Sequence, residues 1–126
     1  MDERFFMYFE EADWCYRMKQ AGGVVYLCPT AKVIHFGGDE IGHYDERKLV
    51  FYHESLLFFY QKYHTLFGAI VLRCILALRS LIRIIVWGIA GIGKPSLRNA
   101  AIASIKGYVR VFGLVIGVAS PTKAAS

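Results

Sequence analysis

The sequence predicts an α/β fold over its first 65 residues, followed by hydrophobic basic helices, and three observations lead to this prediction. Residues 9–22 carry apolar side chains at helical spacing. Two short apolar runs, at 24–28 and 31–36, have the composition of β-strands. Residues 48–63 then return to a helical pattern, and the chain beyond them is dominated by aliphatic stretches that glycine and proline interrupt.

Local signals place the ends of these first elements. In the first helix, Asp13 and Arg17 are four residues apart, so their side chains can pair on one face. Gly22-Gly23 is expected to end this helix, because glycine adopts the left-handed conformation without a steric penalty. The run 24–28 is expected to form a buried strand that ends at Pro29.

The most hydrophobic part of the chain is predicted to form two helices, at 68–93 and 97–118, separated by Lys94-Pro95-Ser96. Residues 70–89 contain twelve Leu, Ile and Val, and a helix of this length is about 30 Å long, enough to cross a bilayer core. The arginines argue against a simple span. Each central arginine costs about 2.5–3.5 kcal/mol on insertion, whereas each aliphatic residue returns only about 0.3–0.6 kcal/mol.

On a helical wheel, Arg73, Arg79, Ser80 and Arg83 share one polar arc, with Trp87 at its margin. This pattern is typical of a helix that lies in the membrane interface with its arginines reaching the lipid phosphates. Two alternatives remain for this region. It can form a helical hairpin packed on the N-terminal half, or a transmembrane hairpin.

Charge divides the chain sharply. Residues 1–65 hold all ten acidic side chains and seven Lys or Arg, for a net charge of −3. Residues 66–126 hold eight Lys or Arg and no acidic side chain, for a net charge of +8. A segment without carboxylates cannot neutralise itself and favours an anionic partner. Because this segment is rich in Leu, Ile and Val, we expect an anionic membrane surface as the partner and no nucleic acid.

The three cysteines, Cys15, Cys28 and Cys74, show no C-x-x-C spacing, and no secretory signal pattern precedes them. We therefore expect free, buried thiols in a reducing cytosol.

An acidic cluster, Glu10-Glu11-Ala12-Asp13, opens the first helix. A carboxylate at a helix N-terminus is kept ionised by the helix dipole and can take a proton from a hydroxyl group that acts as a nucleophile. Taken alone, the cluster has a simpler interpretation, because acidic residues are common in the first turn of any helix.

The wider pattern resembles inverting family 2 glycosyltransferases, especially the bacterial rhamnosyltransferase-like and galactofuranosyltransferase-like members. The resemblance covers residues 2–63 and is carried by the Asp2–Phe6 run, the cluster with the Cys15-Tyr16-Arg17 that follows it, and Ser55–Lys62. It implies that residues 1–65 are the incomplete acceptor-side portion of a type-A nucleotide-diphosphosugar transferase domain. Residues 66–126 would form an amphipathic, membrane-associated region. The half that binds the sugar nucleotide is missing, so we expect no activity from the chain alone.

The resemblance also implies roles for individual residues. The catalytic base of the family corresponds to Glu11, with Glu10 and Asp13 beside it. The family usually has aspartate at the Glu11 position, and misplacing a reacting group by about 1 Å can lower the rate on the order of 100-fold.

His35 would help to hold Mg²⁺ or Mn²⁺ together with an Asp-x-Asp motif. This chain has no such motif, so the metal is expected only in a complete enzyme. The alternative for His35 is a hydrogen-bonded core histidine. We interpret His43 and His53 as surface residues.

The implied function is transfer of a sugar from a nucleotide-sugar donor to a hydroxyl group of a saccharide or polyprenyl-diphosphate-linked acceptor in cell-envelope polysaccharide synthesis. The implied location is the cytoplasmic face of the inner membrane, where the protein would be peripheral or membrane-associated. A missing N-terminal half is a further expected partner. The competing hypothesis is a non-enzymatic peripheral membrane protein in which residues 1–65 form a small docking module.

Overall fold

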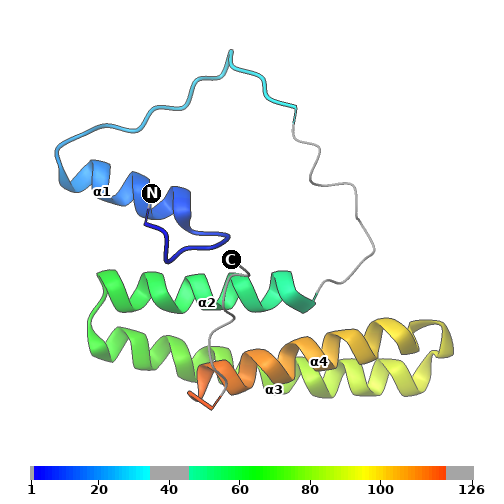
Figure 1. The fold of residues 1–126 in the computed structure, drawn as a ribbon. Coiled ribbons are helices and arrows are strands. Elements are labelled where there is room, and N and C mark those ends of the chain that lie inside the picture. Colours follow the sequence, from blue (N-terminus) through cyan, green and yellow to red (C-terminus); the bar gives the residue numbers. More distant parts are fainter. Residues whose placement is uncertain (1, 35–45, 119–126) are drawn as a thin grey trace.

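The computed structural model describes residues 2–34 and 46–118, which form four α-helices and a short 3₁₀ turn. The helices are α1 (Glu10–Gln20), α2 (Glu46–Tyr63), α3 (Leu66–Gly93) and α4 (Arg98–Val115), and the turn η2 (Pro95–Leu97) joins α3 to α4. Figure 1 shows α1 beside α2, to which Asp13 and Lys62 connect it. Helix α2 lies along the antiparallel pair of α3 and α4. The four helices predicted from the sequence are confirmed, and their ends differ from the predicted ones by only a few residues.

The predicted α/β fold is wrong for the residues that the structure describes, since neither range contains a β-strand. Residues 24–34 have no regular structure and run outside the helices (Figure 1). Leu27 is 92% exposed and Val33 is 89% exposed, so the expected buried strand at 24–28 and the start of the second strand are not formed. A strand must pair its backbone groups with a neighbouring strand, and the described ranges supply none. Positions 35 and 36 lie outside the described residues.

The helix ends follow from local chemistry. Gly22 has a φ of 82°, and the N–H of Gly23 donates to the carbonyl of Met18 at 2.8 Å, so the two glycines end α1 as predicted. At the start of α3, the side-chain oxygen of Thr65 accepts from the N–H of Gly68 at 3.2 Å.

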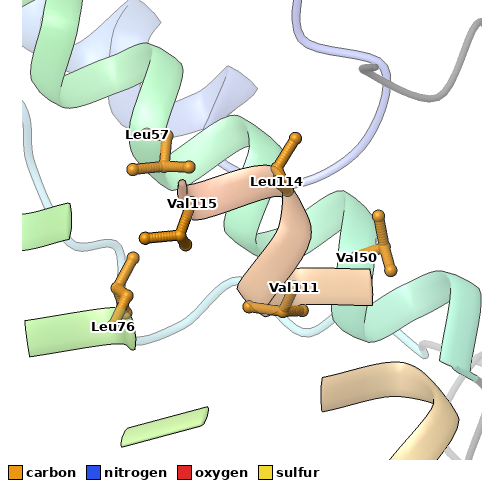
Figure 2. Packing of buried hydrophobic residues seen from close by; sticks show 6 residues of the cluster. All are labelled: Val50, Leu57, Leu76, Val111, Leu114 and Val115. Atoms are coloured by element: carbon orange, nitrogen blue, oxygen red, sulfur yellow. The ribbon is translucent and has the colours of Figure 1, made fainter. Parts of the chain in front are cut away.

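The hydrophobic core lies where α2, α3 and α4 meet. Six buried aliphatic side chains form it, as Figure 2 shows: Val50, Leu57, Leu76, Val111, Leu114 and Val115. Burying one such side chain contributes about 1.5–3 kcal/mol, so this cluster accounts for much of the cohesion of the three helices. The predicted division of the chain at 65/66 stays a prediction, although α2 packs on both helices that follow that boundary.

Three residues of the polar arc of α3 contact the rest of the protein, whereas Arg83 is exposed to solvent. Arg73 donates to the main-chain carbonyl of Val115, and Arg79 donates to His53 Nε2 at 2.9 Å. The hydroxyl of the buried Ser80 donates to the carbonyl of Leu76. The helical wheel predicted that these arginines reach lipid phosphates, whereas Arg73 and Arg79 are hydrogen-bonded to groups on α4 and α2.

His53 is buried in α2, so its interpretation as a surface residue is wrong. Its Nδ1–H donates to the carbonyl of Leu49 at 2.7 Å, and its Nε2 accepts from Arg79. In the neutral form of the imidazole, both ring nitrogens therefore have a hydrogen-bond partner. Burial lowers the pKa of His53, and the nearby charge of Arg79 lowers it further.

Within residues 2–34 and 46–118, the structure contains no helix whose length and apolar character would suffice for a membrane crossing.

Candidate functional site at the start of the first helix

A strained turn leads into α1. Tyr8 and Phe9 have φ values of 68° and 67°, in the left-handed region that costs a non-glycine residue about 1–2 kcal/mol. Aromatic contacts hold both residues in place. The rings of Tyr8 and Phe9 lie 5.8 Å and 5.5 Å from the ring of Tyr52, and Phe9 also contacts Phe59 at 5.6 Å. Strained backbone of this kind persists where the surroundings enforce it and is common at functional sites.

Directly after this turn, Glu10 and Glu11 occupy the first two positions of α1. The side chain of Glu11 is exposed to solvent. Glu10 is half-buried, and its Oε2 is buried without a hydrogen-bond partner in the described part of the chain. An unsatisfied buried oxygen costs about 1–3 kcal/mol, so this carboxylate oxygen destabilises the start of α1 unless it finds a donor.

Asp13, one turn further along, is fully buried. Its carboxylate accepts hydrogen bonds from Lys62 Nζ at 2.5 Å, from the hydroxyl of Tyr63 at 2.6 Å and from Arg17 Nε at 2.9 Å. Burial alone would raise the pKa of Asp13, but these three donors outweigh it and hold the pKa below its ordinary value. The predicted pairing of Asp13 with Arg17 is confirmed.

The same lysine binds a second carboxylate. Lys62 Nζ lies 2.7 Å from Asp2 Oδ2, and Asp2 also pairs with Arg4 at 2.9 Å. The hydrogen bonds that Lys62 donates to Asp13 and Asp2 raise the pKa of Lys62, and those that Asp2 accepts from Arg4 and Lys62 hold the pKa of Asp2 well below its usual range. In addition, the hydroxyl of Ser55 donates to the carbonyl of Met7 at 2.7 Å.

Sequence reasoning missed these contacts of Lys62 and Ser55. Both residues belong to the Ser55–Lys62 pattern that carried part of the resemblance, and the structure brings this pattern against the segment that contains Glu10 and Glu11. The signal was therefore present, but the sequence did not indicate that the two motifs touch.

A pocket of about 460 Å³ lies between the N-terminal segment, α2 and the adjoining ends of α3 and α4. Its size falls in the range of small-molecule sites. Phe6, Phe51 and Phe58 contribute to an aromatic lining. Its two arginines are already engaged, Arg4 with Asp2 and Arg73 with a main-chain carbonyl, so the pocket offers mainly apolar surface.

The predicted metal ligand, His35, lies outside the described residues. Across the described ranges, no group of three or more His, Cys, Asp or Glu side chains is placed to hold a metal ion. The described residues therefore do not by themselves form a Mg²⁺ or Mn²⁺ site, and metal binding through His35 stays a prediction.

All three cysteines are free thiols, but Cys28 and Cys74 are exposed and Cys15 is only partly buried. The expectation of buried thiols is therefore wrong for Cys28 and Cys74.

Comparison with known proteins relates the chain to glycosyltransferases. It is 33% identical over 92 residues to N-acetylglucosaminyl-diphospho-decaprenol L-rhamnosyltransferase from two strains of Mycobacterium tuberculosis. The match covers 65% of this chain and 30% of the relative, so the chain spans about a third of the length of the proteins it resembles. No family model matches the chain. No solved structure matches it.

Proposed function

We propose that this chain is the C-terminal part of an inverting family 2 glycosyltransferase that acts in cell-envelope polysaccharide synthesis. The observation that carries the proposal is the acidic segment Glu10–Asp13. A strained, aromatic-backed turn presents its first two carboxylates at the start of α1, and Asp13 anchors that helix to Lys62. The similarity to rhamnosyltransferases over 65% of the chain supports the proposal.

In this proposal the three carboxylates have different roles. Glu11, exposed at the helix N-terminus, takes the proton of an acceptor hydroxyl as its oxygen attacks the anomeric carbon of the donor sugar. The bond from that carbon to the phosphate of the donor breaks in the same step, and the nucleotide leaves. Glu10, half-buried beside Glu11, accepts a hydrogen bond from the acceptor through its carboxylate. Asp13 is a positioning residue, because its buried carboxylate is fully occupied by three donors.

The names of the relatives suggest the first substrates to test. We propose transfer of L-rhamnose from a nucleotide-sugar donor to an N-acetylglucosaminyl-diphospho-polyprenol acceptor. The chain alone is expected to be inactive. A nucleotide-sugar donor must be held next to the acceptor hydroxyl for transfer, and the proposal assigns donor binding to the part of the enzyme outside this chain.

A chimera tests this function. The aligned 92-residue segment of the Mycobacterium tuberculosis relative is replaced by the matching segment of this chain, and rhamnosyl transfer to the decaprenol-linked acceptor is measured. We expect the chimera to be active. Glu11→Gln in the chimera should lower kcat about 100- to 10,000-fold, the usual contribution of a general base. Glu3→Gln, which changes an exposed glutamate outside the cluster, is the matched control and should leave kcat unchanged.

Two results would contradict the proposal. One is a chimera with native helical content by circular dichroism that transfers no sugar. The other is transfer that persists unchanged in Glu11→Gln. If the chimera does not fold, titration of the full chain with the acceptor remains informative, because Glu10→Gln should weaken acceptor binding and Glu3→Gln should not.

A non-enzymatic membrane-binding protein is the second candidate function, and the exposed aliphatic face of α3 favours it. This function predicts binding to lipid vesicles together with an inactive chimera.

A further inference from the structure

The outward face of α3 is apolar along almost its whole length. Ten Ile, Leu and Val side chains between Ile70 and Ile92 are exposed, and we call them the apolar strip. They fall within about 160° of the helix circumference, at 100° per residue, and extend roughly 33 Å along the axis. Soluble monomers rarely expose a continuous apolar surface of this extent, so the strip indicates a binding surface.

The polar side chains of α3 lie outside this strip. Arg73 and Arg79 bind to Val115 and His53, and Ser80 is buried, so the polar side of the helix is used for packing. Arg83, on the same side, is exposed to solvent. Two of the three arginines of α3 therefore bind other helices, while the ten aliphatic side chains of the strip face solvent.

The charge around the strip points to its occupant. Residues 66–118 contain seven Lys or Arg and no Asp or Glu. Lys94 and Arg98 are exposed at the two sides of η2, directly after Ile92, which is 87% exposed. A protein partner would have to match both the apolar strip and the exposed positive charges of Lys94 and Arg98 beside it. The surface of an anionic bilayer offers both a hydrocarbon layer and phosphate groups.

We infer that α3 docks the protein onto an anionic phospholipid membrane. In this arrangement α3 lies parallel to the surface, the apolar strip enters the acyl boundary, and Lys94 and Arg98 contact lipid phosphates. The inference does not depend on the proposed transferase activity, because it rests only on the exposed face of α3 and the charge of the α3–α4 pair.

Flotation with vesicles tests the inference on the full chain. We expect the protein to float with vesicles of phosphatidylcholine and phosphatidylglycerol, and to bind more weakly to phosphatidylcholine alone. The Lys94→Gln/Arg98→Gln variant should weaken binding to the anionic vesicles by roughly fivefold per charge removed. It should leave binding to phosphatidylcholine alone unchanged.

The two exposed cysteines provide a matched pair of probes. Cys74 lies on the face that carries the strip, whereas Cys28 lies in the segment that follows α1. Both probes are made in a Cys15→Ala background. An environment-sensitive fluorophore is attached to Cys74 in a variant that also carries Cys28→Ser, and to Cys28 in a variant that also carries Cys74→Ser. Addition of anionic vesicles should shift the emission from Cys74 to the blue and leave the emission from Cys28 unchanged.

Substitutions on the strip complete the test. Ile75, Ile82 and Ile89 lie in one line, and all three are at least half exposed. Changing all three to Glu should therefore preserve the fold and abolish flotation, a loss of more than about 100-fold because three charges would enter the apolar boundary. Leu27→Glu, which changes an exposed leucine outside α3, is the control and should float like the unmodified chain.

The inference is wrong if the full chain does not float with anionic vesicles, or if it floats without a shift in the Cys74 emission. It is also wrong if the chain forms a stable dimer in lipid-free solution that shields Cys74 and persists when vesicles are added. The occupant of the strip would then be a second copy of the chain.

Discussion

Lys62 Nζ lies 2.5 Å from Asp13 Oδ1, so the last turn of α2 is bound to the first helix by a contact between residues 49 positions apart. The same ammonium binds Asp2, which brings the N-terminal segment to the same point. The orientation of Glu11, only two residues from Asp13, therefore depends on α2.

Neutralising Asp13 should destabilise the fold. Asp13→Asn removes the negative charge that compensates Lys62 and Arg17 at this buried site. Breaking a buried ion pair of this kind costs about 3 kcal/mol. The free energy of unfolding is measured by urea titration followed by circular dichroism. Glu11→Gln, which changes an exposed carboxylate of the same helix, should stay within about 0.5 kcal/mol of the unmodified chain.

A double-mutant cycle with Lys62→Met shows whether the loss comes from the Asp13–Lys62 contact. The effects of Asp13→Asn and Lys62→Met should not add, because both remove the same interaction. Additive effects, or an unchanged urea midpoint in Asp13→Asn, would show that this contact does not hold α1 on α2.

The length of the side chain at position 11 should control the rate of transfer. Glutamate places its carboxylate about one C–C bond further from the backbone than the aspartate that resembling enzymes usually carry. Glu11→Asp in the active chimera should therefore raise kcat by up to about 100-fold. Initial rates at saturating acceptor check this prediction. A lower kcat would indicate that the site is built around glutamate.

The buried imidazole of His53 should make stability depend on pH. Burial lowers its pKa, so the unfolded chain binds a proton first as the pH falls through about 6.5, the ordinary histidine value. Between that pH and the lower pKa of the folded state, the unfolded state holds more protons and the free energy of unfolding decreases. Above about pH 6.5, His53 therefore does not lower the free energy of unfolding. Below that pH, it lowers the free energy of unfolding progressively.

Urea titrations between about pH 7 and pH 5 test this dependence. His53→Gln should show a smaller loss of stability over this range than the unmodified chain. His64→Gln, which changes an exposed histidine just after α2, should show the same loss as the unmodified chain. Equal pH dependence in all three proteins would contradict the assignment to His53.

The sequence predicted features that depend on neighbouring residues. The end of α1 at Gly22 and the pairing of Asp13 with Arg17 are set within one or two helical turns, and both are confirmed. The contact of Lys62 with Asp13 could not be predicted in the same way. It depends on how α2 packs against α1, which no local pattern specifies.

The wrong strand prediction and the unforeseen partners of the α3 arginines have a common cause. Val24–Cys28 has the composition of a strand, but a strand also needs a partner, and composition carries no information about one. The helical wheel likewise grouped Arg73 and Arg79 on one side of α3 without indicating whether that side faces solvent or the protein. The acceptors that decide this, Val115 and His53, come from other helices.

Two glycines of α3 provide a matched pair for testing the packing of α3 on α4. A Cβ atom added at Gly91 would lie 2.9 Å from the Cβ of Ala101, whereas a Cβ added at Gly88 would have no neighbour within 4 Å. Gly88→Ala should raise stability by up to about 1 kcal/mol, because alanine favours the helix. Gly91→Ala gains the same propensity but overpacks the contact at a cost of about 1–3 kcal/mol, so it should lower stability.

Thermal unfolding of the two variants distinguishes these effects, since the melting temperature should rise for Gly88→Ala and fall for Gly91→Ala. Ala101→Gly removes the Cβ atom that the new Cβ of Gly91→Ala would meet. Combining the two substitutions should therefore relieve the overpacking. The double variant should therefore be less destabilised than the sum of its two single changes. If both glycine variants raise the melting temperature equally, α3 and α4 do not approach each other closely at Gly91.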